Sequence, residues 1–275
     1  LYAAIILAAL LAEYVLDVTS DVLTLRNLTG ELPDEFADVF DDDEYETAKD
    51  YTRVRTRFGL LQSTLGLAVL LGFLFAGGFE GLDTLVRGLE YGPIVSGLIY
   101  IGAIALALQL LSLPFSIYST FVIEERFGFN ETTPTTFALD LLKGTALSAA
   151  IGGPLLAALL WFFTSTGPYA WVYAWIAVTV VMLGLQFLAP RYLMPLFNDF
   201  DPLEEGELRE RILAYADRVD FPVGEVYVMD GSRRSNKANA FFTGFGANRR
   251  IVLFDTLVDE LSADELLTVV AHEMG

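Results

Sequence analysis

Residues 144–190 read GTALSAAIGGPLLAALLWFFTSTGPYAWVYAWIAVTVVMLGLQFLAP and carry no charged side chain. A helix needs about 20 apolar residues to cross the hydrocarbon core of a bilayer, so this stretch is long enough for two crossings. The sequence TSTGP at residues 164–168 predicts a turn between them. A helix buried in a soluble protein usually has a polar face, whereas these residues are apolar all round. The stretch therefore predicts two membrane spans, at about residues 144–163 and 169–190.

Three stretches nearer the N-terminus predict further spans. The first, residues 1–16, is interrupted only by Glu13, and the second, residues 58–79, has no charge. The third stays uncharged from residue 94 to residue 123, which is longer than a bilayer requires. Because proline lacks the N–H that a helix interior needs, Pro114 is expected to kink or stop this helix, and the span is expected to end near Leu113. Residues 1–193 are thus expected to form a membrane domain with five spans, at about 1–16, 58–79, 94–113, 144–163 and 169–190.

Composition and the placement of positive charge agree with this interpretation. The mean hydropathy is +0.49, which is high for a soluble domain. Lys and Arg favour cytoplasmic loops, and here they gather after the first and third expected spans. These residues are Arg26, Lys49, Arg53, Arg55 and Arg57 in one loop, and Arg126 and Lys143 in the other. We therefore expect a multi-pass protein of the cell membrane, with its N-terminus outside and the residues after Pro190 in the cytoplasm.

The net charge indicates which binding partners and which kind of source organism are expected. The chain has 36 acidic and 17 basic residues and a formal net charge of −19. Nucleic acid is not expected as a partner, because phosphate binding needs a basic footprint. An acidic, lysine-poor surface is suited to a high-salt cytoplasm, which predicts a halophilic source, such as a halophilic archaeon. The chain has no cysteine, so a metal site would use His and carboxylate ligands.

The composition after Pro190 becomes that of a small α+β unit, expected at residues 194–275. Residues 203–219 predict an amphipathic helix, and Leu208, Ile212, Ala216 and Val219 form its apolar stripe. Residues 225–229, 239–245 and 250–254 predict strands, the last two joined as a hairpin through Gly246, Ala247 and Asn248. Ser262 and Glu265 predict a capping box that opens a final helix.

The final helix ends in His272-Glu273-Met274-Gly275. Zinc peptidases with the pattern H-E-x-x-H place two His four residues apart, so that both reach one ion from the same helical face. The closing His would be residue 276. His272 is the only histidine and follows an apolar run, so we expect it to leave a buried helix, where an imidazole needs a partner. A core histidine bonded to a backbone carbonyl would explain this pair equally well.

Five sequence blocks, taken in their order along the chain, favour a zinc ligand over a core histidine at His272. They are residues 123–130 (IEERFGFN), 194–198 (MPLFN), 228–232 (VMDGS), 239–245 (NAFFTGF) and 250–257 (RIVLFDTL). In this order, before a His-Glu helix, the blocks resemble the type I CAAX prenyl endopeptidase family of integral-membrane zinc metallopeptidases. The resemblance extends over nearly the whole chain and implies a mainly α membrane protein, with five transmembrane helices followed by a small α+β zincin-like catalytic unit.

The resemblance also implies the roles of individual residues. His272 would bind Zn²⁺, and the remaining zinc ligands would lie beyond Gly275. Glu273 would be the catalytic base. Asn239, Ala240 and Phe241 would bind the substrate, because a strand beside the catalytic helix commonly pairs with an extended peptide. We expect the chain to be truncated at both ends, within its zinc-binding helix at one of them, and to be inactive by itself.

The expected function is membrane-embedded zinc metalloendopeptidase activity. Its substrates would be polypeptides, such as C-terminal tails of lipidated or misfolded membrane proteins, cleaved in CAAX-type processing or in membrane-protein quality control. The lipid bilayer would be its other partner. The alternative is a non-catalytic polytopic membrane protein, such as a transporter or scaffold, although such proteins usually place buried charges at broken helices.

Overall fold

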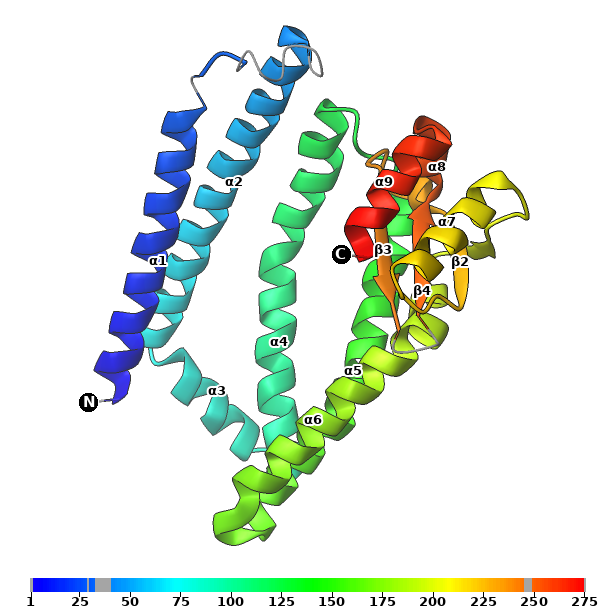
Figure 1. Ribbon diagram of the computed structural model, residues 1–275. Coiled ribbons are helices and arrows are strands. Elements are labelled where there is room, and N and C mark those ends of the chain that lie inside the picture. Colours follow the sequence, from blue (N-terminus) through cyan, green and yellow to red (C-terminus); the bar gives the residue numbers. More distant parts are fainter. Residues whose placement is uncertain (1, 29, 33–40, 245–248, 275) are drawn as a thin grey trace. The chain divides into compact units, whose positions relative to one another are not determined.

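The computed structural model of the chain describes residues 2–28, 30–32, 41–244 and 249–274. The chain forms two compact units, whose elements are labelled in Figure 1. The first unit comprises Leu1–Glu90 and Ala103–Phe127, and the second comprises Tyr91–Gly102 and Gly128–Gly275. The chain therefore passes between the units three times, after Glu90, after Gly102 within the helix α4, and after Phe127.

Long helices make up the first unit. They are α1 (Tyr2–Asn27), α2 (Asp42–Phe75), α3 (Gly78–Arg87) and most of α4 (Pro93–Tyr118), which continues as a π-helix over Ser119–Glu124. In Figure 1, α1 runs beside α2, and the Tyr14 and Thr64 hydroxyls form a 2.7 Å hydrogen bond between them. Asp41 caps α2 by accepting a hydrogen bond from the Glu44 N–H at 2.7 Å.

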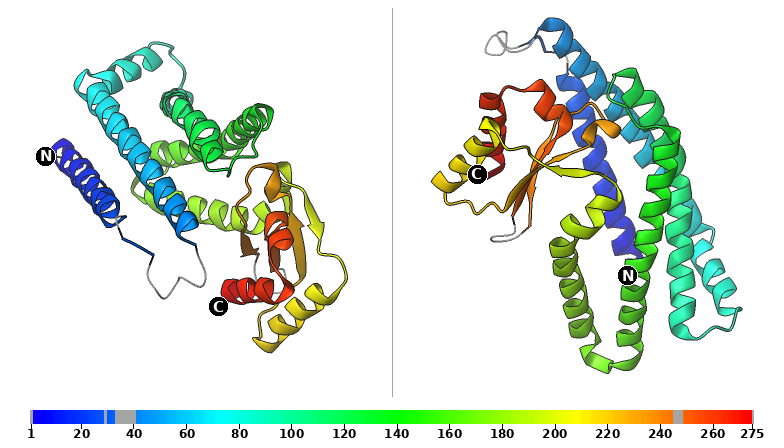
Figure 2. Two further views of the ribbon diagram at one scale, coloured as in Figure 1. Left: turned by 90° about the horizontal axis from the view of Figure 1, so that it is seen from above. Right: turned by 90° about the vertical axis from the view of Figure 1, so that its right-hand side faces the viewer.

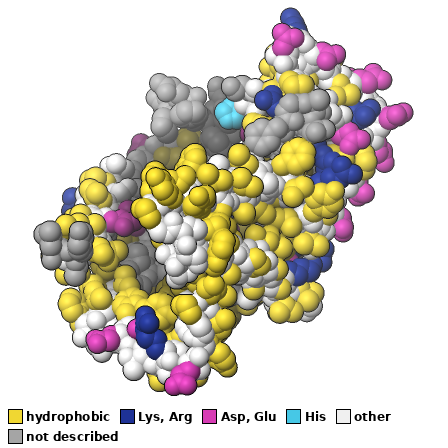
Figure 3. All heavy atoms as spheres, turned by 90° about the horizontal axis from the view of Figure 1, so that it is seen from below, with side chains coloured by type: hydrophobic (Ala, Val, Ile, Leu, Met, Phe, Trp, Pro, Cys, Tyr) yellow, Lys and Arg dark blue, Asp and Glu magenta, His cyan; other side chains and the backbone are white. Residues whose placement is uncertain are grey.

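Four helical segments in the described part of the chain are long and apolar enough to cross a membrane. They are Asp42–Phe75, Pro93–Glu124, Pro134–Ser165 and Gly167–Leu196. Large apolar side chains on these segments are exposed, including Phe75 at 73% and Trp175 at 67%, and hydrophobic side chains cover much of the face in Figure 3. Helix α1 carries Glu13, Asp17 and Asp21, and the first of the five expected spans stays a prediction.

The helix stop expected at Pro114 is wrong, because α4 continues through this residue to Tyr118. A proline inside a helix removes one backbone donor and leaves the carbonyl four residues earlier, here that of Leu110, without its helical partner. The nearby Ser112 and Ser116 hydroxyls donate to other carbonyls, those of Gln109 at 3.0 Å and of Ser112 at 3.2 Å. The helix nevertheless continues at the position where the sequence pattern predicted a break.

A helical hairpin opens the second unit. Helix α5 (Pro134–Ser165) is followed by a 3-10 turn at Gly167–Tyr169 and by α6 (Ala170–Leu188), which packs against α5. The break between the helices confirms the turn predicted at residues 164–168, and Gly167 supplies the positive φ of 61° that the reversal requires. A π-helical segment, Ala189–Leu193, and a 3-10 turn, Met194–Leu196, lead into the sheet.

The sheet has four strands in the order β1-β2-β4-β3. Its strands are β1 (Phe200–Pro202), β2 (Glu225–Met229), β3 (Ala240–Thr243) and β4 (Arg250–Phe254). Strands β2 and β4 are parallel, and both outer pairs are antiparallel. The accompanying helices are α7 (Glu207–Arg218), α8 (Asp255–Glu260) and α9 (Ala263–Met274).

One face of the sheet packs against α7 and α9 (Figure 2), where the apolar core of this unit lies. This core joins Ile212 of α7, Leu266 and Val270 of α9, and inward side chains of the strands such as Ile251 and Leu253. All five side chains are at most 2% exposed. Burial of such side chains is the main favourable contribution to folding, so the core fixes how α9 lies on the sheet.

Several local predictions can be compared with these elements. Strands β2 and β4 confirm the runs predicted at 225–229 and 250–254, and the antiparallel pairing of β3 with β4 confirms a hairpin. Its turn at Gly246-Ala247-Asn248 lies outside the described residues. Helix α7 begins at Glu207 rather than residue 203, and Val219 is 44% exposed, so it does not belong to the buried stripe. Asp220 follows with φ of 55°, which ends the helical repeat.

Candidate active site

Helix α9 carries the His-Glu pair. Of the capping box predicted at its start, the bond from the Ser262 N–H to the Glu265 side chain is present. Glu265 accepts hydrogen bonds from the Ser262 N–H at 2.9 Å and from the Ser262 hydroxyl at 2.7 Å. These bonds hold the pKa of the Glu265 carboxyl below its usual range. A carboxylate near a helix N-terminus also satisfies donors that the helix leaves unpaired. Leu266 and Val270 then seat the helix in the core.

His272 projects away from that core. It follows Val270 by two residues, or about 200° around a helix, and its side chain is exposed. Thr268, four residues earlier on the same face, is exposed as well. Helix α9 is buried through Leu266 and Val270, as expected, but the His272 imidazole is exposed among the described residues, so burial does not argue for a partner. An exposed imidazole is available to a ligand, and the half-buried Glu273 follows it directly.

The donor set fits part of a zinc site. An accessible imidazole is a suitable zinc ligand, and a site of the H-E-x-x-H type takes two imidazoles and a further donor. In residues 2–28, 30–32, 41–244 and 249–274, no group of three or more His, Asp or Glu side chains lies close enough to hold a metal ion. A zinc ion held by His272 would therefore need donors from outside these residues.

Strand β3 ends the described sheet on the side of α9 and keeps one edge free of strand pairing. Asn239 accepts a hydrogen bond from the Phe254 N–H at 3.0 Å, and Ala240, Phe241 and Phe242 lie opposite Leu253, Val252 and Ile251. Antiparallel hydrogen bonding alternates between successive pairs. The backbone groups of Phe241 therefore face β4, whereas those of Ala240 and Phe242 face the free edge.

This geometry changes which predicted residues could pair with an extended peptide. The Ala240 N–H already donates to the Asn239 side chain at 2.9 Å, which leaves the Ala240 carbonyl and the Phe242 N–H and carbonyl on the open edge. The backbone carbonyl of Asn239 and the backbone groups of Phe241 point toward β4 instead. Sequence reasoning missed Phe242, although the period of two along a strand would have separated it from Phe241.

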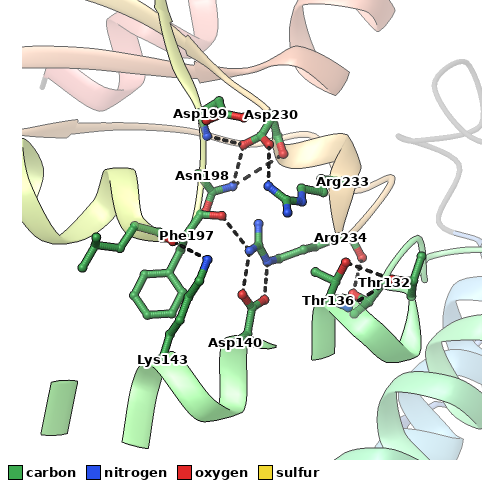
Figure 4. Close-up of polar contacts among 12 residues, drawn as sticks. Thr132, Thr136, Asp140, Lys143, Phe197, Asn198, Asp199, Asp230, Arg233 and Arg234 are labelled. Carbon is green, nitrogen blue, oxygen red and sulfur yellow. Dashed lines mark hydrogen bonds and ion pairs between the residues drawn. The ribbon is translucent and has the colours of Figure 1, made fainter. Parts of the chain in front are cut away.

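A polar network ties α5 to the loop after β2, as Figure 4 shows. The Arg234 guanidinium donates to both carboxylate oxygens of Asp140, at 2.8 and 3.0 Å, and to the Phe197 carbonyl at 2.7 Å. Asp230 accepts from the Asn198 side chain at 3.0 Å and from the Asp199 N–H at 2.9 Å. Sequence reasoning missed this network, because its members are far apart in the chain.

A second set of contacts joins the same loop to the residues that precede α5. The Asn236 side chain donates to the Gly128 carbonyl at 3.0 Å and to the Glu131 carboxylate at 2.9 Å. Asn130 and Ser235 form an isolated antiparallel bridge. The loop before β3 is thus anchored from both sides, which positions the strand next to α9.

Two known protein families match the sequence of this chain. Residues 22–199 match the family described as "CAAX prenyl protease N-terminal, five membrane helices", and residues 202–275 match "Peptidase family M48". Together the two matches include the helical segments, the sheet and the His-Glu pair.

Curated relatives give the same result. The chain is 37% identical over 256 residues to CAAX prenyl protease 1 of Saccharomyces cerevisiae, covering 89% of this chain and 56% of the relative. It is 36% identical to the homolog from Arabidopsis thaliana, covering 92% of the chain and 62% of the relative. Identity to the human homolog is 37%, covering 85% and 51%. The chain thus spans between half and two thirds of the length of these relatives.

A solved structure has the same fold. The crystal structure of S. mikatae Ste24p superposes with a TM-score of 0.90 at 35% identity, covering 97% of this chain and 64% of that one. The two family matches, the curated relatives and this superposition agree, and the chain therefore belongs to the CAAX prenyl protease family of membrane proteins, within peptidase family M48.

Proposed function

We propose that the protein is a membrane-embedded zinc metalloendopeptidase whose catalytic site includes His272 and Glu273. The observation that carries this proposal is the exposed His272 followed by the half-buried Glu273 late on α9, a helix that packs against the free edge strand β3. A helix with a metal ligand and an acid beside it, next to a strand that can hold a peptide, is the arrangement that peptide hydrolysis requires.

Each residue would have a separate task. His272 would hold zinc through its imidazole, with the remaining ligands supplied from beyond Gly275 in the whole protein. When bound, zinc supplies Lewis-acid chemistry that polarises the scissile carbonyl and stabilises negative charge on its oxygen. Glu273 would accept a proton from the attacking water and donate it to the leaving amine. The edge of β3, at Ala240 and Phe242, would hold the substrate backbone in an extended form.

The substrate class and topology follow from the family and the charge pattern. The relatives are named CAAX prenyl proteases, so polypeptides with prenylated C-terminal tails are the proposed substrates, with misfolded membrane proteins as a further class. Residues 1–193 would form the membrane domain and residues 194–275 part of the catalytic one. The proposed location is the cell membrane, and the loop arginines and lysines support an orientation with the N-terminus outside and the catalytic unit in the cytoplasm.

Zinc content of the whole protein tests the role of His272. The whole protein would be purified as wild type and as His272→Ala, and metal would be measured by mass spectrometry alongside cleavage of a prenylated peptide. We expect stoichiometric zinc and cleavage in the wild type, and loss of both in the variant with its fold retained. Normal zinc content in His272→Ala would contradict the assignment.

A further inference from the structure

A cavity of about 280 Å³ lies where α6 meets the sheet of the second unit. Its lining includes the last residues of α6, Phe187 and Leu188, then Arg191 and Tyr192, and finally Arg249 and Arg250 at the start of β4. These segments are far apart in the sequence, so the fold brings three guanidinium groups to one cavity. It lies apart from the His-Glu pair of α9, none of whose residues line it.

Among the described residues, none of the three arginines forms an ion pair with a carboxylate, although the chain has more than two acidic residues for each basic one. Glu225 also lines the cavity and lies opposite Arg250 in the sheet; its carboxylate accepts a hydrogen bond from the Tyr227 hydroxyl and keeps its negative charge. The lining therefore carries three positive side chains and one negative one, a net positive charge in a chain whose net charge is −19.

Aromatic rings orient these guanidinium groups. Arg249 lies over the Phe221 ring at 4.5 Å, and Arg250 lies over the Tyr227 ring at 5.1 Å. A guanidinium that rests on a ring uses its flat face, which leaves its N–H edge for an oxygen ligand. Planar N–H pairs of this kind match the oxygens of phosphate. The cavity is therefore suited to a phosphate group rather than to a neutral molecule.

The cavity also lies at the end of a helix that is apolar enough to cross a membrane. Gly167–Leu196 is such a segment, and Tyr192 is exposed beyond the last turn of α6. Tyr and Arg commonly occupy the boundary between the hydrocarbon core and water. Leu183 and Phe187, which precede the cavity on α6, are more than half exposed and form an apolar surface leading away from it. A ligand with a phosphate head and apolar tails matches both surfaces.

We propose that this cavity binds the phosphate of an anionic phospholipid at the membrane boundary, with Arg191, Arg249 and Arg250 contacting the phosphate and the acyl chains lying along α6. The volume is near the lower end for ligand pockets, which suits a head group alone. Such a lipid would fix the sheet relative to the end of α6, since it would bridge β4 and the segment after that helix.

Lipid binding to the delipidated whole protein tests this proposal. The probes are dioleoyl phosphatidylglycerol, dioleoyl phosphatidylcholine and inorganic phosphate, added in detergent and followed by native mass spectrometry. We expect phosphatidylglycerol to bind at least tenfold more tightly than phosphatidylcholine. The variant with Arg191→Gln, Arg249→Gln and Arg250→Gln should lose this preference, and millimolar inorganic phosphate should not displace the lipid.

Controls separate the site from general charge and from misfolding. Arg209→Gln with Arg218→Gln on α7 removes two arginines outside the cavity and should keep the preference. Arg191→Gln alone changes an exposed residue, so it should fold normally and reduce the preference at least threefold. Equal lipid preference in wild type and in the Arg191 variant would overturn the proposal. Displacement by inorganic phosphate at equal affinity would overturn the lipid as the ligand.

Discussion

The ion pair between Asp140 and Arg234 gives the clearest test at the scale of single residues. Both side chains are about three-quarters buried, and their two hydrogen bonds join α5 to the loop that leads to β3. Asp140→Asn would leave the largely buried Arg234 guanidinium without its counter-charge, which typically costs about 2 kcal/mol. We expect a thermal midpoint several degrees lower for this variant.

The control for this prediction is Asp264→Asn, which breaks an ion pair with Arg211 at the surface. Asp264 is 81% exposed there, and exposed ion pairs contribute little to stability. Its thermal midpoint should equal that of the wild type. Equal midpoints for both variants would show that the Asp140 pair does not hold the loop in place.

Glu265 gives a prediction about pH. Hydrogen bonds from the Ser262 hydroxyl and N–H lower the pKa of its carboxyl in the folded protein. The unfolded pKa is about 4.3. A lowered folded pKa contributes stability above the unfolded value, and this contribution is lost as pH falls through the folded one. Glu265→Gln should therefore lower the thermal midpoint at pH 7, and the difference from the wild type should shrink as pH falls below the unfolded pKa; a pH-independent difference would contradict this.

Single residues also show what the sequence could and could not predict. The Ser262 and Glu265 contact was predictable because both partners lie within one turn of helix. The exposure of His272 was not, because an apolar run before a residue does not say which side of the helix meets the core. The Asp140 and Arg234 pair joins residues 94 positions apart, and no local pattern predicts such a contact.

Strand β3 carries the main prediction at the scale of elements. The Phe242 N–H faces the free edge, so Phe242→Pro would remove a donor for substrate without breaking the ladder to β4. Loss of one backbone hydrogen bond should lower peptide cleavage in the whole protein about tenfold through KM. Steady-state kinetics with a prenylated peptide would measure this change.

Two controls isolate the backbone of β3. Phe242→Ala removes the side chain and its contact with the Phe221 ring but keeps the N–H, so its KM should lie nearer to that of the wild type. Phe241→Pro removes a donor that faces β4 and should lower the thermal midpoint. If Phe242→Pro and Phe242→Ala had the same KM, the free edge would not bind substrate.

The sequence pattern predicted some of the other helices and strands but not all of them. Strands β2 and β4 were predictable, since each is a run of β-prone residues bounded by turn residues. Strand β1 was not, because three residues including Pro202 form a strand only through pairing with β2. The continuation of α4 through Pro114 was likewise not predictable, because a proline in a helix interior favours a kink or a stop.

The proposed topology can be tested on the whole molecule because the chain has no cysteine. Single substitutions Asp43→Cys, Ser165→Cys and Glu260→Cys lie in the first turn of α2, at the last residue of α5 and at the last residue of α8. In intact cells, an impermeant maleimide should label only the Ser165 variant. Labelling of the Asp43 or Glu260 variant before permeabilisation would reverse the proposed orientation.

The family and the membrane character were predictable from the sequence, because the signals for both extend over many residues and several ordered blocks. The source stays a prediction, since the relatives described above are from yeast, a plant and human, and the net charge of −19 by itself supports a high-salt origin. The number of spans also stays a prediction, because α1 carries three acidic residues within a largely apolar helix.

Peptide cleavage by the Glu273→Gln variant of the whole protein tests the proposed function most directly. The substitution keeps the size of the side chain and leaves His272 in place, but it removes the carboxylate that would accept a proton from water. Glu260→Gln, an exposed glutamate on α8, is the matched control. We predict normal zinc content with cleavage reduced at least 100-fold in Glu273→Gln and unchanged in the control. Near-normal cleavage by Glu273→Gln would contradict the assignment of the catalytic base.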